Sequence, residues 1–222
     1  MAEVLIENIS YLNDPQCFSE NYERMSAYRR AALDNMKLQK DRMLSLGAGI
    51  LLNKALDSCG LSGEYTIAYG KYGKPYFPQI KDQFRFSLSH SGTMAMCVFS
   101  SDVENRALST GCDIQEKRKT DLKIAERFFH PSEYELIMKE ADHEKRTDLF
   151  YRLWTLKESC LKAAGTGTLL SMKDFRIELN TDENPSVWKD DQRMLFTFEE
   201  IRDIPGYSAS YCIAEEHDPD GI

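Results

Sequence analysis

The sequence has 222 residues, of which 42% are hydrophobic, and its 36 acidic and 28 basic side chains give a net charge of −8. This balance argues against general binding to nucleic acid, whose phosphates attract an excess of positive charge. The longest nearly apolar run, Leu46–Leu52, is much shorter than a bilayer-spanning helix, so we expect no membrane association. The first residues carry acid rather than the basic region of a secretion signal, which predicts a cytoplasmic protein. Six dispersed cysteines without a Cys-x-x-Cys pair favour neither a zinc site nor a disulfide framework.

The first hundred residues predict helices followed by antiparallel strands. Apolar alternation predicts strands, and helical spacing predicts helices. The strands are expected at 3–9, 65–69, 84–88 and 94–99, and the helices at 20–36 and 41–56. Turn-forming residues predict turns at Gly70–Pro78 and Ser89–Gly92. The polar stretch 100–109 is the candidate connection to a second lobe.

The remaining residues repeat this order of helices and strands. We expect strands at 110–114, 175–179, 195–198 and 207–213, and helices at 122–129, from Pro131, and around Trp154. Ser132 and Glu135 fit a capping box for the helix that begins near Pro131. The tail 215–222 is polar and expected to be loosely held. The sequence therefore predicts an α+β protein with two similar lobes, 1–104 and 105–222.

The stretch 150–165 predicts a helix with one buried stripe, formed by Phe150, Leu153, Trp154 and Leu161, and Gly165-Thr-Gly167 is expected to end it. Glu158 and Lys162 are four residues apart and project from the same side. Such pairs are common on solvated helix faces. Glu158 nevertheless follows Trp154 by one turn, at the edge of the buried stripe. The flanking Lys157 and Lys162 suit a carboxylate that holds a cation beside an anionic ligand.

Three other motifs carry side chains suited to phosphate or metal. In Gly111–Gln115, strand alternation places Asp113 and Gln115 on one face, where with Glu158 they offer oxygen ligands for Mg²⁺. The serine-rich segment around His90 could hold a phosphate through hydroxyls, amides and a protonatable ring. Lys74 lies in a Gly-Lys-Pro turn that could hold it near a ligand. Each motif alone is more often structural.

Taken together and in order, these motifs resemble a known family. The set is Gly73-Lys-Pro75, Phe86–Gly92, Gly111–Gln115, Arg127-Phe-Phe129 with Glu133, and Trp154–Gly167. It is similar to the 4′-phosphopantetheinyl transferases of the larger, surfactin-synthetase-activating type. The resemblance implies a pseudo-dimeric α+β fold with coenzyme A between two lobes. It also implies Mg²⁺-dependent transfer of the phosphopantetheine arm to a serine of an acyl or peptidyl carrier protein, with release of adenosine 3′,5′-bisphosphate. This is a holo-[acyl-carrier-protein] synthase-type reaction.

The resemblance also implies a role for individual residues. Asp113 and Glu158 become metal ligands that face the pyrophosphate, and Gln115 stands where the family usually has a third acid. Lys162 contacts the pyrophosphate with Lys157 beside it, His90 contacts the 3′-phosphate, and Lys74 and Ser89 line the nucleotide end. Glu158 is the favoured general base, and Glu133 is the alternative. The family's arginine for the 3′-phosphate is replaced by an apolar residue near Leu44, so Arg42, Arg29 or Arg30 is expected to supply that charge.

Two further expectations concern alternatives and partners. A non-catalytic module that binds coenzyme A or a carrier protein is the rival hypothesis, and Gln115 is its only support in the sequence. Carrier proteins are generally acidic, so Lys117-Arg118-Lys119 and the apolar side of helix 122–140 are candidate docking surface. Two lobes in one chain predict a monomer.

Overall fold

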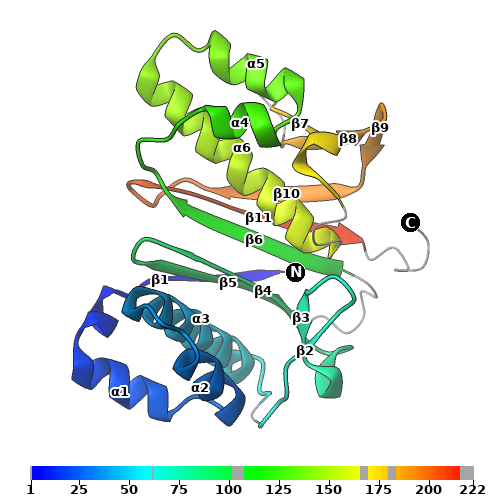
Figure 1. The fold of residues 1–222 in the computed structure, drawn as a ribbon. Coiled ribbons are helices and arrows are strands. Elements are labelled where there is room, and N and C mark those ends of the chain that lie inside the picture. The colour runs from blue at the N-terminus through cyan, green and yellow to red at the C-terminus, as the bar shows by residue number, and fades with distance from the viewer. Residues whose placement is uncertain (1, 62, 102–107, 166–169, 180–183, 216–222) are drawn as a thin grey trace.

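In the computed structural model, helices lie on two outer sides and two antiparallel sheets meet between them (Figure 1). The structure describes residues 2–61, 63–101, 108–165, 170–179 and 184–215. The expected lobe boundary near 104, the Thr166-Gly167 part of the helix stop and most of the carboxyl tail lie outside these ranges. Within the described ranges, no helix combines the length and hydrophobicity needed to cross a membrane.

The first lobe packs helices against a three-stranded sheet with the order β1-β5-β4. Its strands are β1 (Glu3–Asn8), β4 (Arg85–Ser91) and β5 (Met94–Ser100), and a small hairpin adds β2 (Ala68–Tyr69) and β3 (Pro75–Tyr76). Its helices are α1 (Pro15–Glu23), α2 (Ala27–Asp34) and α3 (Gln39–Ser58). The apolar α3 lies against this sheet and fills the centre of the lobe's core.

The second lobe packs the long helix α6 (His143–Ala164) on a sheet with the order β10-β11-β6. The strands of that sheet are β6 (Leu108–Glu116), β10 (Phe196–Ile201) and β11 (Tyr207–Glu215). The lobe also contains α4 (Lys123–Phe128), α5 (Pro131–Lys139) and a second small sheet of β7 (Arg176–Glu178), β8 (Ser186–Lys189) and β9 (Gln192–Met194). The Asp142 side chain caps the start of α6, and Gly165, with φ +65°, ends it.

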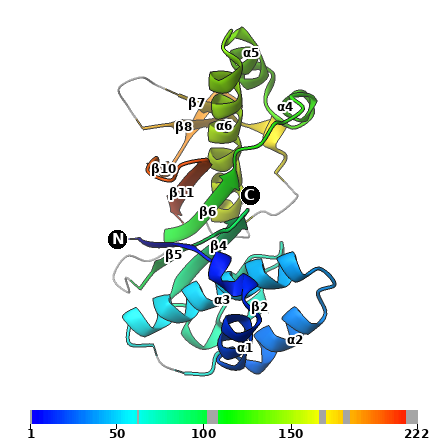
Figure 2. The same ribbon diagram turned by 90° about the vertical axis from the view of Figure 1, so that its left-hand side faces the viewer.

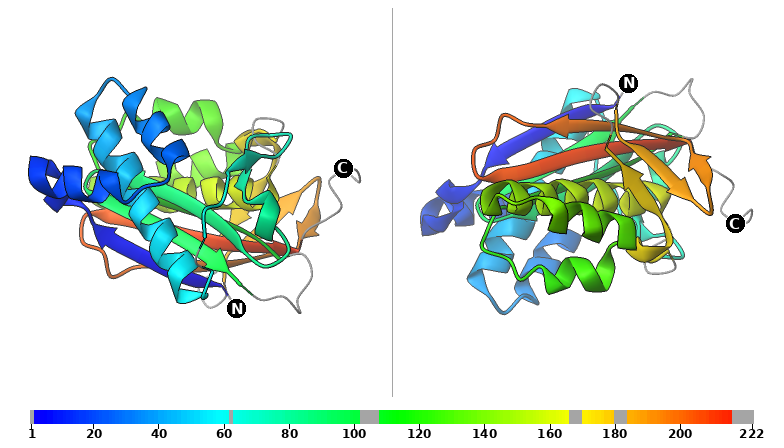
Figure 3. Two further views of the ribbon diagram at one scale, coloured as in Figure 1. Left: turned by 90° about the horizontal axis from the view of Figure 1, so that it is seen from below. Right: turned by 90° about the horizontal axis from the view of Figure 1, so that it is seen from above.

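The two lobes share one topology. Each contains a strand, a long helix and two further strands, and the last strand lies between the other two: β1-β5-β4 and β6-β11-β10. A separate apolar cluster lies between the sheets, formed by Met96, Val98, Cys112, Ile114 and Ala209. Figures 2 and 3 show α1–α3 on one side of the paired sheets and α4–α6 on the other. The predicted α+β architecture of two similar lobes is confirmed.

Three local predictions were wrong. The helix expected at 20–36 is two helices, because the Ser26 side chain accepts a bond from Arg29 N and starts α2 anew. The turn expected at Ser89–Gly92 begins later, since Ser89–Ser91 continue strand β4 and Gly92 has φ +59°. The capping box of α5 uses His130 and Glu133 rather than Ser132 and Glu135. The candidate docking segment 122–140 contains the two helices expected at 122–129 and from Pro131, α4 and α5.

Candidate functional site

Helix α6 lies directly on strand β6, and Gly111 makes this approach possible. A Cβ at Gly111 would collide with the Ser159 carbonyl oxygen and the Ala163 nitrogen. The contact face of the helix carries small hydroxyl residues, and Ser159 Oγ lies 3.3 Å from Ser210 Oγ of β11. This close approach places Lys162, on the next turn of α6, beside Asp113 of β6.

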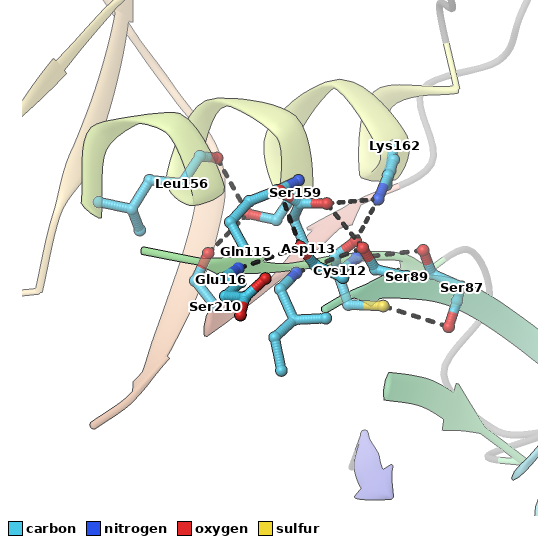
Figure 4. A network of polar contacts seen from close by, with 12 residues as sticks. Ser87, Ser89, Cys112, Asp113, Gln115, Glu116, Leu156, Ser159, Lys162 and Ser210 are labelled. Atoms are coloured by element: carbon cyan, nitrogen blue, oxygen red, sulfur yellow. Dashed lines mark hydrogen bonds and ion pairs between the residues drawn. The ribbon is translucent and has the colours of Figure 1, made fainter. Parts of the chain in front are cut away.

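Asp113 is the centre of a polar network between the lobes (Figure 4). Lys162 Nζ donates to Asp113 Oδ1 and to the Cys112 carbonyl, both at 2.8 Å. Ser89 Oγ donates to the same Asp113 oxygen at 2.7 Å, and Gln115 Nε2 donates to the other at 3.1 Å. Burial opposes the charge on Lys162, but Asp113 outweighs it and raises the pKa of the ammonium group. The predicted common face of Asp113 and Gln115 is confirmed.

Glu158 lies on the same face of α6 as Lys162. Its pKa is raised, first by burial and then by the negative charge of Asp113, while Lys162 acts in the opposite direction. No hydrogen-bond donor among the described residues holds its carboxylate. Two carboxylates that feel each other's charge, with one lysine beside them, are poised to accept a further cation.

An open pocket of about 330 Å³ lies between α3 and the facing ends of β4 and β6. It is lined by Lys40, Asp41, Leu44, His90, Ser91, Gly92, Gln115, Glu116, Arg118 and Tyr151. Partial removal from water lowers the pKa of His90, and the charge of Lys162 acts in the same direction. The pocket thus brings His90 and Lys40 of the first lobe together with Gln115 of the second.

Lys157 does not belong to this cluster, although we expected it there. Its side chain is fully buried, and Nζ donates to Glu133 Oε1 and to the Phe175 carbonyl, both at 2.7 Å. Glu133 is equally buried and also accepts bonds from the backbone nitrogens of His130 and Ile177. The pair ties α5, α6 and β7 together inside the second lobe. Glu133 therefore has no path to a substrate hydroxyl.

Lys74 and Arg42 do not line the pocket between α3, β4 and β6. Lys74 extends from the β2–β3 hairpin to the carboxyl end of α6, where Nζ bonds Ser109 Oγ, the Thr110 carbonyl at 3.0 Å and the Ala163 carbonyl at 3.2 Å. Arg42 packs over the Phe18 ring at 5.3 Å, and its Nε is buried without a hydrogen-bond partner among the described residues. Arg42 does not line the pocket between the lobes, whereas Lys40, two residues earlier, does.

Sequence comparisons with known proteins show the family of this chain. Residues 109–214 match the model of the 4′-phosphopantetheinyl transferase superfamily. A 4′-phosphopantetheinyl transferase of Bacillus subtilis is 32% identical over 187 residues, which cover 80% of this chain and 78% of that protein. The chain belongs to the 4′-phosphopantetheinyl transferase family.

Other similar proteins match different shares of this chain and of their own length. The transferase Sfp of Bacillus subtilis strain 168 is 34% identical over 152 residues, 68% of this chain and 64% of Sfp, so the match spans just under two thirds of that relative. The transferase gsp of Aneurinibacillus migulanus is 28% identical over 96% of this chain and 86% of its own length. The holo-[acyl-carrier-protein] synthase structure of Thermotoga maritima is 23% identical and covers 51% of this chain and 71% of that one, with a TM-score of 0.40, too weak a likeness to support an argument.

Sequence reasoning found the site residues on the β6 and α6 motifs and missed others. Arg118 and Tyr151 line the pocket, and the Tyr151 hydroxyl accepts a bond from Arg118 N at 3.1 Å. No local pattern marks Tyr151, because its place depends on how the 117–120 segment folds back onto α6. Lys40, two residues before Arg42, was not among the residues expected at the 3′-phosphate. Its position at the start of α3, a helix that runs toward the sheet edge, could have singled it out.

Proposed function

We propose that this protein transfers the 4′-phosphopantetheine group of coenzyme A to a serine of a carrier protein. The serine oxygen bonds to the phosphorus that bears the pantetheine arm, and the bond from that phosphorus to the bridging oxygen of the diphosphate breaks. Adenosine 3′,5′-bisphosphate leaves with the electron pair, and the hydroxyl proton passes to a base. Family membership supports the proposal, as does the cluster of Asp113, Glu158 and Lys162, which Gln115 joins to an open pocket between the lobes.

The oxygen donors fit a magnesium ion. Asp113 and Glu158 offer two carboxylates, and Gln115 offers an amide oxygen if its side chain reverses, since its nitrogen now faces Asp113. The described residues contain no group of three or more His, Cys, Asp or Glu side chains that could hold a metal, so these two carboxylates would be the charged ligands. Bound there, Mg²⁺ would offset the negative charge that develops on the diphosphate oxygens during transfer.

The remaining residues bind and orient coenzyme A in this scheme. Lys162 lies beside Asp113 and supplies the positive charge for the diphosphate. His90 and Lys40 face the pocket between the lobes and would contact the 3′-phosphate. Of the arginines considered for that phosphate, Arg30 is paired with Glu23, and Arg29 lines a separate pocket of about 430 Å³ in the first lobe.

Glu158 is the better candidate for the general base. A raised pKa brings a carboxylate nearer to the value that suits proton abstraction at neutral pH, and this side chain is only partly buried. Glu133 is held by Lys157 and two backbone amides inside the lobe.

The surface of α4 and α5 is the proposed docking site for the carrier protein. Four large apolar side chains are exposed there, Ile124, Phe128, Leu136 and Met138, beside the exposed bases Lys123, Arg127 and Lys139. An acidic partner with an apolar helix face would match this composition. Raising the ionic strength should slow modification of the carrier, whereas an unchanged rate would place docking elsewhere.

The direct test combines purified protein, coenzyme A, Mg²⁺ and a panel of apo-carrier proteins, followed by intact-mass measurement of the carriers. We expect one carrier or more to gain the mass of one phosphopantetheine group, and the same carrier with its acceptor serine replaced by alanine to gain none. If no carrier gains that mass while coenzyme A still binds, the protein is a binding module.

A further inference from the structure

The two sheets present edge strands to each other without pairing their backbones. Strand β4 is an edge of the first sheet and β6 is an edge of the second, and they lie side by side (Figure 1). Strand β6 pairs with β11 on its other side. The outward amides of β6 therefore need partners, because an unsatisfied amide in a buried joint is costly.

Three serines of β4 provide those partners at regular spacing. Ser87 Oγ accepts from Cys112 N at 3.1 Å, Ser89 Oγ accepts from Ile114 N at 3.3 Å, and Ser91 Oγ accepts from Glu116 N at 3.0 Å. We call this set the serine ladder: Ser87, Ser89 and Ser91 with the amides they bind. Alternate residues of a strand share one face, so the ladder fixes the register between the lobes.

Ser89 differs from the other two because its hydroxyl proton reaches the site. While it accepts from Ile114 N, Ser89 Oγ donates to Asp113 Oδ1 at 2.7 Å (Figure 4). Ser89 is buried, and the Asp113 side chain is only 3% exposed. The Ser89 hydroxyl thus contacts both the β6 backbone, which sets the register between the lobes, and the Asp113 carboxylate.

We infer that Ser89 is a positioning residue for Asp113. It holds Oδ1 of the carboxylate together with Lys162, which leaves Oδ2, bonded only by Gln115 among the described residues, as the oxygen for a metal ion, and it transmits the alignment of the two lobes to that orientation. The inference rests on the proposed function, because it takes Asp113 as a metal ligand. It goes beyond the expectation that Ser89 lines the nucleotide end, because the one hydroxyl proton of Ser89 is donated to Asp113.

The ladder offers its own matched control. Ser87→Ala removes one amide partner, as Ser89→Ala does, but the Ser87 side chain has no bond to Asp113. Ser89→Ala leaves the Asp113 carboxylate held by Lys162 and Gln115 alone. Both variants should therefore lose similar stability, while only Ser89→Ala should disturb the metal site. Ser89→Thr keeps the hydroxyl and should restore the site.

The experiment titrates Mn²⁺ into each protein in the presence of saturating coenzyme A and reads free Mn²⁺ by electron paramagnetic resonance. Loss of a residue that orients a metal ligand typically weakens affinity 10- to 100-fold, so we expect about 10-fold weaker Mn²⁺ binding in Ser89→Ala. Ser87→Ala and Ser89→Thr should bind like wild type.

Equal Mn²⁺ affinity in Ser89→Ala and Ser87→Ala would overturn the inference, as would a folded Ser89→Thr that fails to restore binding. The proposed function is tested separately by the carrier mass. A wild-type protein that binds Mn²⁺ but modifies no carrier would contradict the function and leave the Ser89 comparison decisive. A wild-type protein that binds no Mn²⁺ would overturn the inference.

Discussion

Helix α6 supplies the lysines of two lysine–carboxylate ion pairs, whose N···O distances are nearly equal but whose surroundings differ. Lys157 and Glu133 are 2.7 Å apart and expose 0% and 1% of their side chains, whereas Lys162 and Asp113 are 2.8 Å apart and expose 31% and 3%. Burial lowers the pKa of Lys157 even against the attraction of Glu133, while the pKa of Lys162 is raised by Asp113 despite its burial. Distance alone therefore does not separate a structural pair from a functional one.

The surroundings of each pair make the distinction. The Lys157 pair is closed off from solvent and also bonds the Phe175 carbonyl and two backbone amides, so a ligand cannot reach it. The Lys162 pair lies near Glu158, whose carboxylate is unheld by any described donor. The Lys162 pair has an additional carboxylate, Glu158, and lies near a pocket. It is therefore the pair suited to bind a metal ion together with a diphosphate.

Of the substitutions considered, Lys157→Met should have the largest effect, which is a loss of folding stability. It leaves Glu133 as a buried carboxylate without its cation, which typically costs about 3–5 kcal/mol. Urea unfolding measures the loss, while the folded fraction should keep the wild-type rate per molecule. A variant of normal stability and low activity would move Lys157 into the site.

Glu158→Gln should lower the rate of transfer by at least about 100-fold, the loss typical of a group that stabilises or deprotonates at the reacting centre. Stability should stay within about 0.5 kcal/mol or rise, because the substitution removes repulsion with Asp113. Steady-state kinetics and unfolding on the same preparation check both. Wild-type turnover would remove Glu158 from the site.

Lys162→Met makes the same substitution as Lys157→Met one and a half turns further along the helix. Lys162 is 31% exposed, and Asp113 keeps its bonds from Ser89 and Gln115, so we expect a smaller loss of stability than in Lys157→Met. Loss of the charge beside the diphosphate should reduce kcat/KM by roughly 10- to 100-fold. The comparison between the lysines fails if Lys162→Met proves as unstable as Lys157→Met.

Gln115→Glu should have the smallest effect. A glutamate cannot donate to Asp113 as the amide does, but it adds a negative charge to the metal site. The Mg²⁺ concentration for half-maximal transfer should fall by roughly threefold to tenfold. An unchanged metal titration would show that side chain 115 points away from the ion.

Sequence patterns predicted the elements whose faces differ in polarity. The alternation around Asp113 depends only on local periodicity and was correct. In the stripe expected on α6, Phe150 and Leu153 are buried, whereas Trp154 and Leu161 are only partly buried. The role of Lys157 could not be predicted, because its burial depends on β7 and α5, which are distant in the sequence. Ser89–Ser91 looked like a turn, since serine favours turns unless another strand offers amides for its hydroxyl to bind, as β6 does here.

The most direct test of the account is a crystal structure of this protein with coenzyme A and Mn²⁺, in which anomalous scattering locates the metal. We predict one ion held by carboxylate oxygens of both Asp113 and Glu158 and contacting the diphosphate, with Lys162 Nζ on a diphosphate oxygen. An ion bound away from these two carboxylates, or a diphosphate remote from Lys162, would contradict the account.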